Sequence, residues 1–138
     1  MNHRIAILSD IHGDTTALEA VIADARALGA TEYWLLGDIL LPGPGREDLF
    51  ELLDTIPITA AVRGNWDDCV LEALDGEYGL EDPQEIQLLR LTQYLMEGLD
   101  TKRIDWLRSL PLVEKKEVNG IRFSLTHNLP EKNYGGDL

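Results

Sequence analysis

The segment IAILSDIHGD, residues 5–14, decides how the chain folds, because a strand, a polar turn and a helix start follow one another in it. Residues 5–8 form a short continuous apolar run, which is typical of a strand buried on both faces. Residues 10–14 are a polar turn, and apolar side chains then recur at helical spacing over residues 18–28. The segment therefore predicts the opening of an α/β fold.

Two further strands are predicted at residues 33–36 and 58–62. A strand, a helix and another strand in this order predict parallel pairing through a right-handed crossover. Thr16 and Glu19 have the spacing of a capping box at the start of the first helix, and Gly29 is suited to end that helix.

The middle of the chain is predicted to be helical. Helices are expected at residues 49–53, 68–74, 82–97 and 101–110. Asp82 is the expected cap of the third of these helices, since Pro83 after it suits the first helical position, and Thr101 is the expected cap of the last one.

The tail of the chain is predicted to be a β-hairpin. Residues 113–118 and 121–126 flank Asn119-Gly120, the dipeptide most typical of a two-residue hairpin turn. Its apolar residues alternate with polar ones, as in a strand with one buried face.

Length and composition limit the class of protein. With 138 residues the chain suits one domain, and we expect residues 1–138 to form it. Asp and Glu number 25 against 12 Lys and Arg, and the resulting net charge of −13 disfavours nonspecific binding to nucleic acid or to an anionic membrane.

Cys69 has no second cysteine to pair with, and no apolar run has the length of a signal peptide core or a membrane span. We therefore expect a cytoplasmic protein.

The residues capable of chemistry gather where predicted strands end. They are Asp10 and His12 after the first strand, Asp38 after the second, Asn65 and Asp67 after the third, and His127 and Asn128 after the last. In open α/β sheets, ligands bind outside the carboxyl ends of the strands. Two carboxylates, two imidazoles and an amide suit a divalent ion such as Mn, Fe, Ni, Co or Zn. Asp38, in the middle of the set, is placed to bridge two ions.

Each of these residues also has a structural interpretation. Asp38 can be an ordinary strand-end turn, Asn65 a turn residue with positive φ, and His127 a polar residue that closes a strand. Asp67 is a candidate proton donor, but a hydrogen-bond acceptor or helix cap is the simpler role for it. Arg63 can bind a phosphate group or form a surface salt bridge.

The motifs SDIHGD at residues 9–14, GD at 37–38, RGNWD at 63–67 and LTHN at 125–128 occur in this order along the chain. Together they resemble the calcineurin-like metallophosphoesterases, in particular their small bacterial phosphodiesterases. The fourth motif is degenerate, because the family usually has Gly where Thr126 stands.

The resemblance implies a β-sandwich flanked by helices, of which this chain holds the N-terminal portion with the second sheet incomplete. It also implies two divalent metal ions: Asp10 and His12 would bind the first, Asn65 and His127 the second, and Asp38 both. A hydroxide between the ions would attack the phosphorus of a small phosphomonoester or phosphodiester. Mn²⁺ is the expected ion, with Fe, Ni, Co, Zn and Mg as alternatives.

The sequence departs from the family in two places. In the family the third motif often has a His, which protonates the leaving group or stabilises the transition state, where this chain has Trp66. The family also ends with a Gly-His-x-His motif, and no histidine follows His127 here. We therefore expect a C-terminally truncated phosphoesterase with impaired activity, rather than a natural short inactive variant. Strands absent from the second sheet would leave an exposed edge or apolar face and favour self-association.

Two other functions fit parts of the sequence. The first is a noncatalytic protein-interaction scaffold on the same fold, similar to a trafficking-coat subunit, which Trp66 and the missing histidines favour. The second is a flavodoxin-like phosphoacceptor domain that uses Asp10, which leaves His12, Asn65, His127 and the closing hairpin unexplained.

Overall fold

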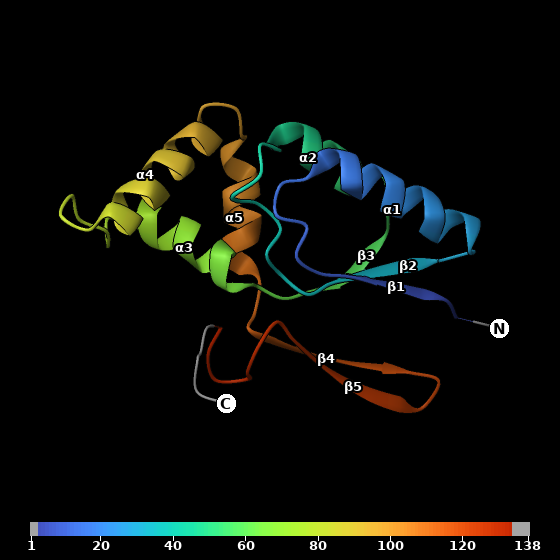
Figure 1. The fold of residues 1–138 in the computed structure, drawn as a ribbon. Coiled ribbons are helices and arrows are strands. Elements are labelled where there is room, and N and C mark those ends of the chain that lie inside the picture. The colour runs from blue at the N-terminus through green and yellow to red at the C-terminus, as the bar shows by residue number, and fades with distance from the viewer. Residues whose placement is uncertain (1–2, 134–138) are drawn as a thin grey trace.

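The computed structural model describes residues 3–133, so residues 1–2 and 134–138 of the predicted domain lie outside the described residues. Two β-sheets and a set of helices make up the fold (Figure 1). The first sheet has the parallel strands β1 (Ile5–Leu8), β2 (Glu32–Leu35) and β3 (Ile58–Ala61) in the order β1-β2-β3. The second is the antiparallel hairpin of β4 (Val113–Val118) and β5 (Ile121–Thr126).

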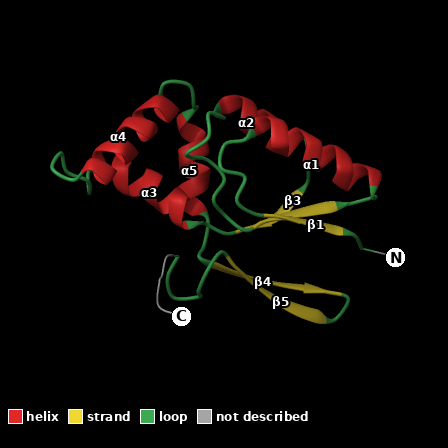
Figure 2. Cartoon of the chain, in the orientation of Figure 1, coloured by secondary structure: helices red, strands yellow, loops and turns green. Residues whose placement is uncertain are grey.

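The helices fall into two groups (Figure 2). They are α1 (Thr15–Ala27), α2 (Glu47–Leu53), α3 (Asn65–Leu74), α4 (Pro83–Met96) and α5 (Thr101–Ser109). The pair α1 and α2 lies over one face of the first sheet, the hairpin lies against the opposite face, and α3, α4 and α5 stand together at one end of that sheet (Figure 1).

Two helix caps and one helix start differ from the prediction. The first helix is capped by Asp14, whose carboxylate accepts from the N–H of Ala17 at 2.9 Å, and not by Thr16 with Glu19. Asp100, rather than Thr101, caps α5. The predicted helix at residues 68–74 begins earlier, at Asn65, so that the third motif lies on the first turn of α3. In α1 and α5 an Asp that lies one or two residues earlier accepts a backbone N–H of the first turn and so caps the helix.

The prediction that β1 is buried on both faces is wrong. Ile7 is 54% exposed, because β1 is an outer strand of the sheet and no described element covers this side chain. The neighbouring strand β2 fits the prediction, since Tyr33, Trp34 and Leu35 are all buried.

The hairpin is fixed to the first sheet by apolar packing and by two polar contacts. Trp34, Val62 and Leu125 form a small buried cluster between the sheets. Glu114 accepts a hydrogen bond from the N–H of Ala61 at 3.0 Å, and Lys116 Nζ donates to the carbonyl of Thr59 at 2.9 Å. These contacts satisfy backbone groups of the outer strand β3 and set the position at which β5 ends.

The strand order excludes the flavodoxin-like alternative, in which the first strand is central. Here β2 is central and β1 is an outer strand. In the part of the chain that the structure describes, no helix combines the length and the apolarity that crossing a bilayer requires.

Candidate metal centre

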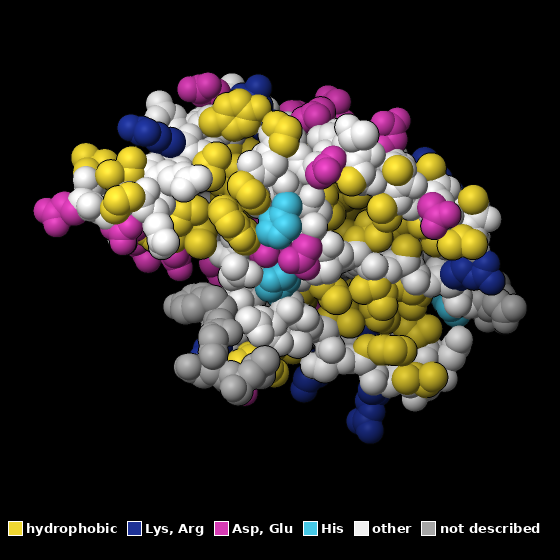
Figure 3. All heavy atoms as spheres, in the orientation of Figure 1, with side chains coloured by type: hydrophobic (Ala, Val, Ile, Leu, Met, Phe, Trp, Pro, Cys, Tyr) yellow, Lys and Arg dark blue, Asp and Glu magenta, His cyan; other side chains and the backbone are white. Residues whose placement is uncertain are grey.

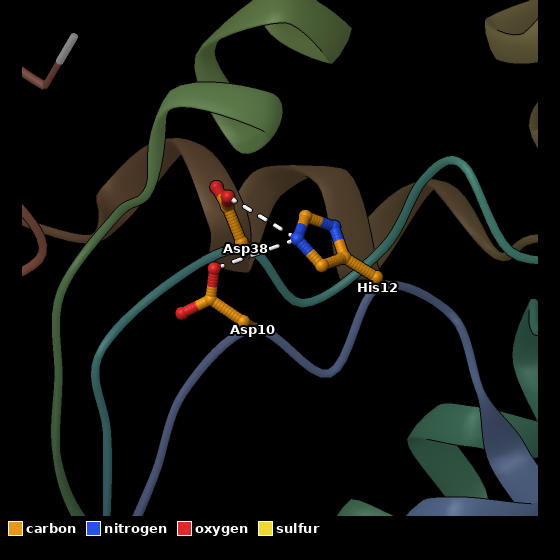
Figure 4. Close-up of side chains that lie close together, drawn as sticks. All are labelled: Asp10, His12 and Asp38. Atoms are coloured by element: carbon orange, nitrogen blue, oxygen red, sulfur yellow. Dashed lines mark ion pairs between the residues drawn. The ribbon is translucent and has the colours of Figure 1, made fainter. Parts of the chain in front are cut away.

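The loops that follow β1 and β2 run side by side and are joined through their backbones. Asp10 N donates to the carbonyl of Gly37 at 3.0 Å, His12 N to that of Asp38 at 2.9 Å, and Gly13 N to that of Ile39 at 2.9 Å. These hydrogen bonds fix the Asp10, His12 and Asp38 side chains on neighbouring loops, as Figure 4 shows.

The three side chains converge on one point. His12 Nε2 lies 3.5 Å from Asp10 Oδ1 and 3.6 Å from Asp38 Oδ2 (Figure 4). One ligand atom from each residue lies within 4.8 Å of the other two. Two carboxylates and an imidazole at this separation form a donor set that a divalent cation fits.

A second group of donors shares Asp38. Nε2 of His127, which follows β5, lies 3.4 Å from Asp38 Oδ2. The same nitrogen lies 2.9 Å from Oδ1 of Asn65, at the start of α3. Asp38 is 2% exposed and lies between the two groups of donors. Since both groups contact it, the five residues predicted as metal ligands lie close together in the structure.

Both histidines are oriented through their other ring nitrogen. Nδ1 of His12 lies 2.8 Å from the carbonyl of Leu41, and Nδ1 of His127 lies 2.6 Å from the carbonyl of Leu36. A carbonyl oxygen only accepts, so each Nδ1 is the nitrogen that donates to it, and each Nε2 faces the carboxylate and amide oxygens. A neutral imidazole held in this orientation can offer Nε2 to a metal ion, so the donor set fits bound cations.

The backbone of the site is strained where the side chains converge. Asp10, His12 and Asp38 have φ values of 57°, 50° and 54°, in the left-handed region that residues with a side chain rarely adopt. Such conformations persist where the surrounding structure imposes them, and they gather at functional sites. Here the hydrogen bonds between the two loops impose them.

Gly64 allows the third loop to approach the site closely. A Cβ on this residue would collide with the backbone nitrogen and the carboxylate of Asp38. Any larger residue would therefore displace the shared carboxylate or the start of α3.

Asp67 joins the loop that follows β2 to the start of α3 through hydrogen bonds to the backbone. Its carboxylate is fully buried and accepts from the N–H groups of Asp38 (2.8 Å), Ile39 (3.0 Å) and Gly64 (2.8 Å). Burial raises the pKa of Asp67 to about 6, although the three hydrogen bonds lower it in part. Asp67 thus contacts the backbone that carries Asp38 and has no exposed atom to offer a substrate.

Burial also raises the pKa of Asp38, and a hydrogen bond from the N–H of Trp66 at 2.9 Å and the two nearby histidines lower it in part. A cation between these groups would favour the carboxylate form for the same electrostatic reason.

Two residues of the third motif face other partners. The guanidinium of Arg63 pairs with Asp68 and donates to the carbonyl of Leu110 at 2.9 Å. The Trp66 ring stands edge-on to the ring of His12, with 6.0 Å between the ring centroids. Trp66 therefore faces His12 with an indole, which has no acidic proton to give at neutral pH.

Figure 3 shows the histidine and carboxylate side chains together at the surface, with hydrophobic side chains on either side. Sequence reasoning missed two features of this region. The carbonyls of Leu36 and Leu41 that orient the histidines carry no sequence signal, because any residue has a carbonyl. A groove of about 370 Å³ between α3 and α4, which begins at Asn65 and Trp66, depends on how two helices pack.

Comparisons with known proteins agree with this geometry. A model of the calcineurin-like phosphoesterase family matches residues 3–136. An uncharacterized protein of Methanocaldococcus jannaschii is 30% identical over 131 residues, which are 92% of this chain and 50% of that protein. The crystal structure of a metallophosphoesterase from Sphaerobacter thermophilus is similar with a TM-score of 0.60 at 32% identity, over 83% of this chain and 44% of that one.

The chain thus spans about half the length of the proteins it matches. The family match covers nearly all of it, and its mixed α/β architecture, which has a two-stranded second sheet in the described residues, is similar to part of that crystal structure. This chain belongs to the calcineurin-like phosphoesterase family.

Proposed function

We propose that this protein is a metal-dependent phosphoesterase that hydrolyses a small phosphomonoester or phosphodiester. The observation that carries the proposal is the position of Asp38 Oδ2, which lies 3.6 Å from His12 Nε2 and 3.4 Å from His127 Nε2. A carboxylate shared by two groups of donors is what a pair of divalent ions requires.

The proposed ligands divide between two ions. Asp10, His12 and Asp38 would hold the first, and Asp38, Asn65 and His127 would hold the second. Mn²⁺ is the proposed metal, with Fe, Ni, Co, Zn and Mg as alternatives, because the set combines carboxylate, imidazole and amide donors. Bound ions would supply charge that neutralises the phosphoryl oxygens and lowers the pKa of an attacking water.

Two further residues of the motifs are assigned to holding the backbone that carries the metal ligands, and not to contact with the substrate. Asp67 holds the backbone of the Asp38 loop and of the α3 start, so we assign it as a positioning residue and not as the proton donor. Arg63 pairs with Asp68 and fixes the entry to α3, so a salt bridge is the role proposed for it rather than phosphate binding. Since Trp66 cannot donate a proton at neutral pH, the site favours esters whose leaving group departs without protonation.

An aryl phosphodiester assay tests this proposal. In the presence of Mn²⁺ the protein is expected to release the phenol, and Asp38→Ala is expected to abolish turnover. Asp24→Ala, at an exposed position of α1, is the matched control and is expected to retain full activity. Turnover that is independent of metal, or equal in the Asp38→Ala variant, would refute the proposal.

A protein-interaction scaffold remains the second candidate, because Trp66 replaces the family's proton donor. A scaffold would keep its fold and its partner after chelation of metal, whereas the enzyme would lose all turnover.

We also propose that copies of this chain associate with one another and that the protein is cytoplasmic. The exposed Ile7 on the outer strand β1 suits contact with a second copy of this chain. Cys69 is a free thiol in the described residues, which suits the reducing conditions of the cytoplasm.

A further inference from the structure

The groove between α3 and α4 is continuous with the candidate metal centre. Asn65 and Trp66 line its inner end. Asn65 Oδ1 also contacts His127 Nε2 at 2.9 Å, and the backbone N–H of Trp66 donates to Asp38 Oδ1 at 2.9 Å. A phosphate ester bound at the metal centre would therefore have this groove beside it.

The outer part of the groove is uncharged. From α4, Gln84, Gln87, Leu88 and Leu91 line it, and the described lining includes no Asp, Glu, Lys or Arg. Figure 3 shows hydrophobic side chains gathered over α3 and α4, beside the histidine and carboxylate cluster. The protein has a net charge of −13, so a groove lined without charged residues differs chemically from the acidic surface of the chain as a whole.

The chemistry of the lining favours one type of substrate group, a flat uncharged ring. The Trp66 indole and the two leucines offer apolar surface to a flat ring, because aromatic and aliphatic side chains bury such rings well. Gln84 and Gln87 are exposed, and their side-chain amides make no hydrogen bond within the described part of the chain. They can therefore pair with polar atoms at the edge of a bound ring. A second phosphate group would find no cation here.

We propose that this groove binds the ester group of the substrate, and that the substrate is a phosphate ester of an uncharged compound with a flat ring. The inference rests on the proposed function, because it assumes that phosphate binds at the metal centre. It assigns Leu88 and Gln87 as residues that determine specificity, although neither lies among the candidate metal ligands.

Two phosphonates that cannot be hydrolysed at phosphorus test this assignment by calorimetry with the Mn²⁺-loaded protein. Phenylphosphonate carries a flat ring and methylphosphonate does not. The expected result is that phenylphosphonate binds about tenfold more tightly or better, because the groove buries the ring. Leu88→Ala is expected to remove most of this preference and to leave methylphosphonate binding unchanged.

A second variant keeps the test informative if Leu88→Ala fails to fold. Gln87→Glu changes an exposed amide into a carboxylate of the same size and is expected to reduce phenylphosphonate binding more than methylphosphonate binding. Gln93→Glu makes the same change on α4 outside the groove and is the control. Equal binding of the two phosphonates, or equal loss of both in the variants, overturns the groove assignment alone. Failure of both phosphonates to bind overturns the proposed function along with it.

Discussion

Asp38 Oδ2 lies 3.4 Å from His127 Nε2, although Asp38 follows a strand of the first sheet and His127 follows the hairpin. The candidate centre is therefore complete only while the hairpin remains docked. Packing of Leu125 against Trp34 and the contacts of Glu114 and Lys116 with β3 provide that docking. The geometry of the second donor group is thus a consequence of tertiary packing.

Replacement of Asp67 is expected to destabilise the fold strongly. Asp67→Ala leaves three buried N–H groups without an acceptor, and the cost is about 3 kcal/mol or more in the free energy of unfolding. Urea denaturation measures it. Asp24→Ala, which removes an exposed carboxylate from α1, is expected to change the free energy by less than about 0.5 kcal/mol. Similar stabilities of the two variants would contradict the positioning role of Asp67.

Introduction of a proton donor at residue 66 is expected to widen the range of substrates. Trp66→His places an imidazole beside His12, where the ring of Trp66 now stands. Turnover of an alkyl phosphate ester, whose leaving group needs protonation, should rise by about 10²-fold, and that of an aryl ester should rise much less. Trp66→Phe is the control without a proton. An equal change for both esters in the His variant would show that residue 66 is not where the proton is needed.

The ion pairs of Arg103 are expected to make stability depend on acidic pH. Arg103 donates to Glu47 at 2.8 Å and to Asp54 at 2.7 Å, and these hydrogen bonds lower the pKa of both carboxyl groups. A lowered pKa in the folded state gives stability that is present above the unfolded pKa and is lost as the pH falls through the folded pKa.

The free energy of unfolding should therefore fall between about pH 5 and pH 3, and Arg103→Met should flatten this dependence. The effect is at most about 1 kcal/mol, because Asp54 is 57% exposed and solvent screens the pair. Arg90→Met, at an exposed position on α4, is the control. Parallel pH profiles for the wild type and Arg103→Met would refute this role.

The exposed side of β1 is expected to drive self-association. Ile7→Lys should weaken association because it places a charge on an outer strand, and added salt should strengthen association of the wild type by screening its net charge of −13. Light scattering over a range of concentrations measures both effects. Leu80→Lys, at a more exposed apolar residue outside the strands, is the control. A wild type that stays monomeric at every concentration would contradict the expectation.

The sequence predicted those parts of the fold that local chemistry determines. The hairpin formed at its predicted residues because Asn119-Gly120 suits a turn with positive φ at both positions, which the structure has. The sequence left two candidate caps for the first helix, because Asp14 and Thr16 are both competent caps, and only the loop geometry decides for Asp14.

The candidate site was predictable as a set of residues but not as an arrangement. Strand ends indicated which side chains would lie at one edge of the sheet. The sharing of Asp38 between His12 and His127, the buried position of Asp67 and the groove along α4 all depend on how separate elements pack. A single sequence holds no direct record of such contacts between elements.

Anomalous diffraction at the manganese edge, from crystals soaked in Mn²⁺, shows whether two ions share the Asp38 carboxylate. We expect two peaks about 3.5–4 Å apart. One peak should lie within bonding distance of Asp10, His12 and Asp38, and the other within bonding distance of Asp38, Asn65 and His127. Peaks that avoid the Asp38 carboxylate, or crystals that bind no manganese at these residues, would contradict this expectation.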